Sequence, residues 1–289
     1  MAAPQNVIAV IFDFDDTLTD DSTTQLLRTY RIDTDEFWGV KQKRLVDDGW
    51  DPTLAYLSLM LEHVGDGKQL GKLSNARLRE FGASLQFYPG LPDLFSELKA
   101  ITTDFRLSNP KVEFYIISGG LEEVIRGSAI AAHMDGIYGC RFAENSSGVV
   151  SAIKNVISFT EKTRFIFEIN KGIGADGNDS RAKPYNVNLS YTPEARRVPL
   201  ANMIYVGDGL TDVPCFSLIE GSGGNGFGVF DAEGAGKAKK AWQQLLAPKR
   251  TRSLNSPKYR ATDDLGAILR MAVTAMCAKI DLKCKQAVD

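Results

Sequence analysis

Three short segments of the chain place carboxylate or hydroxyl side chains directly after runs of apolar residues. The segments carry Asp13 and Asp15 after residues 7–12, Ser118 after residues 112–117, and Asp208 and Asp212 after residues 203–206. Carboxylate oxygens without histidine or cysteine beside them suit Mg²⁺, which also takes water and substrate phosphate as ligands. Gathered carboxylates repel one another unless a cation neutralises them, so these residue types point to metal-assisted phosphate chemistry.

The elements that would position these side chains follow from the hydrophobic pattern. Each apolar run is typical of a strand buried on both faces of a parallel sheet. Helical patterns alternate with these runs at residues 91–101, 121–132 and 160–171, and 138–150 is strand-like. The later elements are expected as helices at 211–219, 236–246 and 262–280, with a strand at 227–230. This alternation predicts an α/β fold with a Rossmann-like, doubly wound parallel sheet. Ligands bind beyond the carboxyl ends of such strands, so we expect the five side chains to converge there.

Two stretches depart from this alternation. Residues 20–86 contain only helical patterns, at 23–30, 34–47, 52–64 and 69–84. We therefore predict an α/β core formed by residues 1–19 and 87–289, with an all-helical insertion at 20–86. Residues 172–199 are rich in Gly, Asn, Asp and Pro and predict a long loop.

Composition excludes several classes of protein. The 289 residues include 34 Lys and Arg against 36 Asp and Glu, so a net charge of −2 gives no field that attracts nucleic acid. The four cysteines form no C-x-x-C pair, which indicates a reducing compartment rather than a disulfide framework or a zinc site. The first apolar run, only six residues long, is too short for a signal peptide or a membrane span. We expect a cytoplasmic protein without a membrane or nucleic-acid partner; the sequence does not indicate its oligomeric state.

The same segments resemble a known family. Residues 13–19 (Asp-Phe-Asp-Asp-Thr-Leu-Thr), 116–120 (Ile-Ile-Ser-Gly-Gly) and 207–212 (Gly-Asp-Gly-Leu-Thr-Asp) are similar to motifs one, two and four of the haloacid dehalogenase superfamily. The phosphoserine-phosphatase-like branch is the most similar, and it inserts a helical cap domain where residues 20–86 stand. The resemblance implies a Mg²⁺-dependent phosphatase with the predicted core and cap.

The resemblance also implies roles for individual residues. Asp13 is the expected nucleophile, forming an aspartyl-phosphate, and Asp15 the general acid and base. Mg²⁺ is expected on the Asp13 and Asp208 carboxylates and the Asp15 backbone carbonyl. Asp212 would orient the waters on the metal. The expected phosphate contacts are Thr17, Ser118 and the Gly119 N–H at the start of the following helix.

Motif three requires a lysine at the start of a helix. Lys162 opens the pattern at 160–171 and is the preferred candidate, with Lys171 and Lys183 as alternatives. It would place a positive charge near Asp13 and the phosphate.

The substrate is expected to be a small phosphorylated metabolite. Phosphoserine phosphatases bind the substrate amine with a glutamate and its carboxylate with a cap arginine. This chain has Ser22 at the glutamate position and no arginine between Trp50 and Asn75, so it departs from the phosphoserine pattern. Two alternatives remain: a metal-dependent nucleotide-sugar transferase that uses Asp13 and Asp15, and a non-catalytic phosphate-binding protein.

Overall fold

Strand β1 (Val7–Phe12) is the central strand of the sheet, and its six apolar side chains are all buried there. The computed structural model describes residues 5–175, 181, 183–230, 239, 242–248, 250–251 and 253–286. The sheet has the order β4-β3-β2-β1-β5-β6-β7. The other strands are β2 (Lys111–Leu121), β3 (Gly136–Glu144), β4 (Val150–Asn155), β5 (Met203–Gly207), β6 (Asn225–Val229) and β7 (Leu254–Asn255). All neighbouring strands are parallel except β3 and β4, which confirms the predicted α/β fold.

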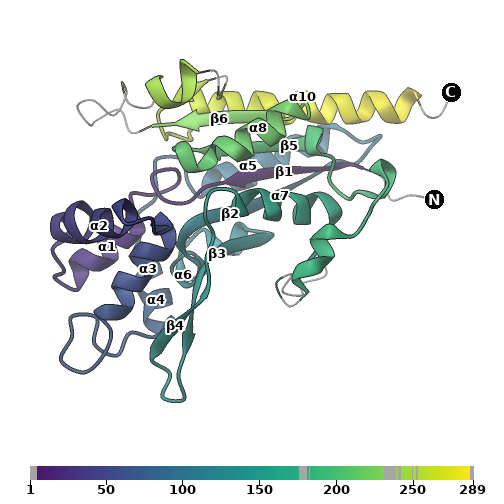
Figure 1. The fold of residues 1–289 in the computed structure, drawn as a ribbon. Helices are drawn as coiled ribbons and strands as arrows, with labels where there is room; N and C mark the ends of the chain where they lie inside the picture. The colour runs from purple at the N-terminus through teal and green to yellow at the C-terminus, as the bar shows by residue number, and fades with distance from the viewer. Residues whose placement is uncertain are drawn as a thin grey trace.

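Helices cover both faces of the sheet (Figure 1). On one face α5 (Asp93–Ile101) packs against α10 (Asp264–Gln286), and on the other α7 (Glu161–Lys171) packs against α8 (Val213–Gly221). The Phe95 ring of α5 lies edge-on to Phe12 of β1, with 6.1 Å between ring centroids. No helix among the described residues combines the length and apolar composition needed to cross a bilayer.

The insertion between β1 and α5 is helical, as predicted. It contains α1 (Ser22–Thr29), a π-helical segment (Glu36–Gln42), α2 (Lys43–Asp47), α3 (Pro52–Glu62) and α4 (Asn75–Gly82). The helix expected at 69–84 begins only at Asn75, because Gly71 has a φ of +52° and Ser74 caps α4 by accepting a hydrogen bond from the Arg77 N–H. Helices α1 to α3 lie beyond the carboxyl end of β1 (Figure 1).

The two connections between insertion and core run side by side. The Tyr88 N–H donates to the Leu18 carbonyl at 3.0 Å, and the Thr19 hydroxyl donates to the Gln86 carbonyl at 2.6 Å. Their position agrees with the predicted boundaries near 19 and 87, although the division into two domains stays a prediction.

Helix α4 packs closely on α6 (Glu122–Gly127) of the core. A Cβ at Gly82 would lie 2.0 Å from the Val124 carbonyl oxygen, and a Cβ at Gly127 would lie 2.0 Å from the Arg79 carbonyl oxygen. Both positions therefore require glycine for this close approach. The insertion is thus fixed to the core by packing as well as by its two connections.

Several predicted boundaries differ from the structure. The stretch at 138–150 is part of a β3–β4 hairpin, whose turn is held by the Asn145 side chain accepting from the Ser147 and Val149 N–H groups. The helix expected at 121–132 ends at Gly127. The expected loop at 172–199 contains, in its described part, 3₁₀ turns at Pro184–Asn188 and Pro193–Ala195. The helix expected at 236–246 lies partly outside the described residues; within it, Trp242–Leu246 form a π-helical turn.

Candidate active site

Asp13 lies at the carboxyl end of β1, where the strand still pairs with β5. Its N–H donates to the Val206 carbonyl at 2.9 Å, and its Oδ1 accepts from the Phe14 N–H at 2.7 Å. The residue is only 6% exposed. Burial raises the pKa of Asp13 to about 6, against the lowering effect of the Lys162 ammonium; the Asp212 carboxylate adds to the increase.

Lys162 in the first turn of α7 reaches this carboxylate through the protein interior. Its Nζ lies 2.6 Å from Asp13 Oδ2 and 2.7 Å from Asp212 Oδ1. Burial by itself lowers the pKa of Lys162, but the two carboxylates outweigh it and hold that pKa above its usual range. Lys171 instead donates to the Val187 and Leu189 carbonyls, and Lys183 is exposed. Of the three candidates, Lys162 is the one beside Asp13.

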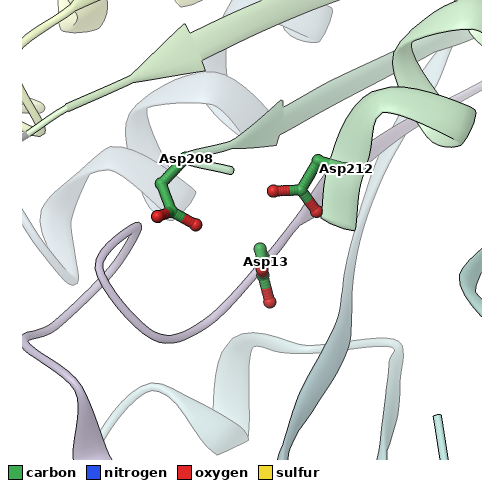
Figure 2. A group of neighbouring side chains, drawn as sticks. All are labelled: Asp13, Asp208 and Asp212. Atoms are coloured by element: carbon green, nitrogen blue, oxygen red, sulfur yellow. The ribbon is translucent and has the colours of Figure 1, made fainter. Parts of the chain in front are cut away.

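Asp208 and Asp212 follow β5 and meet Asp13 from the neighbouring strand (Figure 2). One carboxylate oxygen from each of the three lies within 4.8 Å of the others. Gly207 permits this turn, because a Cβ there would lie 2.5 Å from Asp212 Cγ. The sequence prediction that acidic residues 195 positions apart converge is therefore matched by the geometry of the fold.

The two later aspartates differ in their partners. Asp212 Oδ1 accepts from the Tyr205 hydroxyl at 2.7 Å as well as from Lys162, and its Oδ2 accepts from the Gly209 N–H at 3.1 Å. No hydrogen bond from the described residues reaches the Asp208 carboxylate. Burial, with the charges of Asp212 and Asp13 adding to it, raises the pKa of Asp208 well above its usual value. Asp208 therefore has open ligand positions where Asp212 is held by protein donors.

The cluster fits a divalent cation. Three buried or half-buried carboxylates face one ammonium, which leaves an excess of negative charge in a poorly hydrated place. All of the donor atoms are carboxylate oxygens, as hard cations such as Mg²⁺ prefer.

Asp15 is not part of this carboxylate cluster. Its Oδ1 accepts from the Ser22 N–H at 2.8 Å, and a Cβ at Gly120 would lie 2.5 Å from its Oδ2. Burial raises the pKa of Asp15 to about 8, and the Asp21 charge adds to this increase. A carboxyl that keeps its proton at neutral pH can act as a general acid.

Ser118 and Gly119 lie within strand β2 rather than at the start of a helix. The strand continues to Leu121 through an irregularity after Ile117, and α6 starts at Glu122. This corrects the expected position of Gly119 at a helix N-terminus: extended backbone, not the first turn of a helix, faces the site. The buried Ser118 Oγ accepts from the Gly120 N–H at 2.9 Å.

Thr17 is fully buried and does not line the cavity. Its hydroxyl has no hydrogen-bond partner, and its carbonyl accepts from the Tyr259 hydroxyl at 2.7 Å. Its expected contact with phosphate stays a prediction.

A cavity of about 280 Å³ opens over these residues and receives side chains from the core and the insertion. Asp13, Asp15, Ser118, Gly119, Lys162 and Asp208 all line it. The sequence did not predict that the aromatic residues Trp38, Tyr56 and Phe159 line this cavity. It also did not predict that Tyr205 donates a hydrogen bond to Asp212. A signal existed for Tyr205, because a tyrosine inside a buried aliphatic strand needs a partner for its hydroxyl.

One relative is similar along most of its length. An uncharacterized protein of Borreliella burgdorferi is 31% identical over 236 residues, which span 74% of this chain and 79% of that protein. The chain belongs to the same family as that protein. No protein-family model matches the sequence.

Solved structures share the fold at lower identity. A HAD (haloacid dehalogenase) family hydrolase from Salmonella enterica serovar Typhi has a TM-score of 0.57 and 14% identity, covering 93% of this chain and 72% of that one. A phosphoserine phosphatase solved as a phospho-aspartyl intermediate analogue has a TM-score of 0.55 and 13% identity, covering 92% and 99%. For a probable phosphoserine phosphatase from Vibrio cholerae the TM-score is 0.54 at 14% identity, covering 96% and 68%. The chain has the haloacid dehalogenase fold. This is the fold that the resemblance of the three motifs predicts.

Proposed function

We propose that this haloacid dehalogenase protein is a Mg²⁺-dependent phosphatase that hydrolyses a small phosphomonoester through an aspartyl-phosphate on Asp13. One observation carries the proposal: the buried Asp13 carboxylate, held by Lys162 Nζ at 2.6 Å, lines the same cavity as Ser118 and Asp208. A buried carboxylate, a fixed positive charge and a cavity of about 280 Å³ thus occur together.

The cation would be held by the carboxylates of Asp13 and Asp208 and the backbone carbonyl of Asp15. When bound, Mg²⁺ supplies positive charge that offsets the repulsion between the phosphate and these carboxylates. Asp212, which the Tyr205 hydroxyl and the Gly209 N–H hold in place, would orient water near the cation.

The protein residues would act in two steps. An Asp13 oxygen forms a bond to phosphorus while the ester P–O bond breaks, and the leaving oxygen takes the proton of Asp15. Asp15 then accepts a proton from the attacking water, phosphate leaves, and the Asp13 carboxylate is restored. Lys162 and Ser118 would position the phosphoryl oxygens during both steps.

The proposal includes a role for the insertion and a cellular location. Residues 20–86 would act as a cap that excludes water and selects the leaving group. A cytoplasmic location is supported by Cys140, Cys215, Cys277 and Cys284, all of which are free. The balanced charge favours a small phosphorylated metabolite as partner, without nucleic acid or membrane. A nucleotide-sugar transferase would leave Ser118 and Asp208 in this cavity without a role.

Hydrolysis of p-nitrophenyl phosphate tests the proposal. We expect activity that needs Mg²⁺, is abolished by EDTA, and falls by a factor of at least about 10³ in Asp13→Asn, because the amide cannot form the acyl phosphate. Asp93→Asn on the exposed start of α5 is the matched control and should retain full activity. Undiminished hydrolysis by Asp13→Asn would refute the mechanism, and hydrolysis without Mg²⁺ would refute the proposed requirement for this metal.

A further inference from the structure

Three aromatic side chains line the cavity, and we call them its aromatic wall. Trp38 comes from the π-helical segment, Tyr56 from α3, and Phe159 from the loop before α7. The Trp38 and Tyr56 rings lie against each other, with 5.7 Å between their centroids. At about 280 Å³ the cavity is at the small end of ligand sites, so the leaving group that meets this wall is small.

The π-helical segment is itself a sign of a functional wall. Its wider turn puts Trp38 and Gln42, four residues apart, on the same side, and both line the cavity. Such segments are rare, less stable than α-helix, and frequent at functional sites.

The charge of this wall is negative. Asp21 lines the cavity beside the aromatic rings, and the one basic side chain among the described lining residues is Lys162. Lys162 is already bound by Asp13 and Asp212 at the bottom of the site. An anionic leaving group would therefore be repelled, and a cationic one would be attracted.

The polar atoms of the wall are already paired within the protein. Thr24 N–H and its hydroxyl donate to the two Asp21 oxygens, each at 2.8 Å, and Trp38 Nε1 donates to the Thr24 hydroxyl at 2.8 Å. The Tyr56 hydroxyl donates to the Gly119 carbonyl at 2.6 Å. Asp21, Trp38 and Tyr56 thus offer negative charge and aromatic rings, and their own polar atoms already have partners within the protein. That combination suits a cation that donates no hydrogen bonds.

We propose that the leaving group is an alcohol bearing a quaternary ammonium, held by the ring faces of Trp38 and Tyr56 beside the Asp21 carboxylate. This inference rests on the phosphatase function proposed above and names its substrate class. The phosphate would lie on Asp13 at the bottom of the cavity, with the methylated nitrogen at the aromatic wall.

A comparison of three esters tests the inference in the wild-type enzyme with Mg²⁺. The esters are phosphocholine, its uncharged isostere 3,3-dimethylbutyl phosphate, and phosphoethanolamine, which carries a primary ammonium. We expect kcat/KM for phosphocholine to exceed that for the isostere by about tenfold or more, the size of a desolvated cation–π contact. We expect phosphoethanolamine to fall below phosphocholine, because each Asp21 oxygen already accepts from Thr24 and has less capacity left for the N–H groups of a primary ammonium.

Substitutions in the aromatic wall test whether it is the source of the preference for phosphocholine over the isostere. Trp38→Leu and Asp21→Asn should each lower the ratio of the phosphocholine to the isostere kcat/KM by about fivefold. Asparagine retains the N-cap of α1, so loss of charge is separated from loss of the helix start. The matched control is Asp51→Asn at the N-cap of α3, which does not line the cavity and should leave the ratio unchanged.

The outcomes separate this inference from the function on which it rests. Equal rates for phosphocholine and the isostere, or a preference for phosphoethanolamine, would overturn the substrate class while the phosphatase stands. An unchanged ratio in both Trp38→Leu and Asp21→Asn would overturn the aromatic wall as the binding site. If the enzyme hydrolyses none of the three esters and does not hydrolyse p-nitrophenyl phosphate either, both proposals are overturned.

Discussion

Asp15 occupies surroundings that hold its proton at neutral pH, and this property has a cost in stability. Its pKa of about 8 in the folded protein is far above the ordinary value of 3.8, so between these values the folded state binds a proton that the unfolded state has lost. The unfolding free energy therefore falls as pH rises through this range. The carboxyl is suited to acid catalysis because it is unfavourable as an anion.

Replacing Asp15 should separate these two effects. In metal-free buffer, the unfolding free energy of the wild type should fall from pH 5 to pH 8, whereas that of Asp15→Asn should not fall with it. We therefore expect the stability of the variant relative to the wild type to rise by roughly 2 kcal/mol between these two pH values, and we expect the variant to lose hydrolysis. Urea unfolding at both pH values measures the gain. The exposed Asp35→Asn should show none. A gain that is equal at pH 5 and pH 8 would contradict the raised pKa.

At this same scale, the reactive residues could be predicted and their neighbours could not. Asp13, Asp208 and Asp212 each follow a strand that its apolar run reveals, so the topology of a parallel sheet suffices to bring them together. Trp38 and Tyr56 reach the cavity only through the packing of helices whose mutual arrangement no local pattern encodes.

Among the elements, α4 has a double role, since it belongs to the insertion in sequence and packs on α6 of the core. Its extent was overestimated from the sequence, because the pattern at 69–84 continues through Gly71, which bends the chain with a positive φ. Likewise, Ser118 and Gly119 were expected at a helix start, but they belong to strand β2, which continues past an irregularity after Ile117. Periodicity detects that an element exists, whereas glycine conformation and strand irregularities decide where it begins.

The close packing of α4 on α6 should be sensitive to a single methyl group. Gly82→Ala places a Cβ against the Val124 carbonyl, and we expect it to lower the unfolding free energy by roughly 1–3 kcal/mol. Denaturant titration measures this loss. Gly221→Ala, at the end of α8 with no atom within 4 Å of its Cβ, should instead add roughly 0.4–1 kcal/mol. Equal effects of the two substitutions would show that α4 and α6 are not closely packed in solution.

At the scale of the whole molecule, Tyr259 links the C-terminal part of the chain to the loop that follows Asp13. Its fully buried ring lies edge-on to Phe12, and its hydroxyl donates to the Thr17 carbonyl. This contact joins residues 242 positions apart, and no sequence pattern announces it, because the segment before α10 has no periodicity of its own.

Removing the Tyr259 hydroxyl should remove its hydrogen bond to the loop at Thr17 and leave the buried aromatic ring in the core. We expect Tyr259→Phe to cost roughly 1–3 kcal/mol of unfolding free energy, since the Thr17 carbonyl loses its buried donor, and to lower kcat several-fold. Urea unfolding and p-nitrophenyl phosphate hydrolysis report the two effects. Tyr185→Phe, at an 82% exposed tyrosine, should change neither. A Tyr259→Phe protein with wild-type stability and rate would show that the contact does not support the loop.

The Tyr259 contact also has a consequence for the order in which the chain is synthesised and folds. Asp13 leaves the ribosome shortly before Thr17, but the hydroxyl that holds the Thr17 carbonyl is made 242 residues after Thr17. At about 5–20 residues per second, that interval lasts roughly 10–50 s. A growing chain therefore carries Asp13 for that interval before the Tyr259 hydroxyl can hold the loop in place.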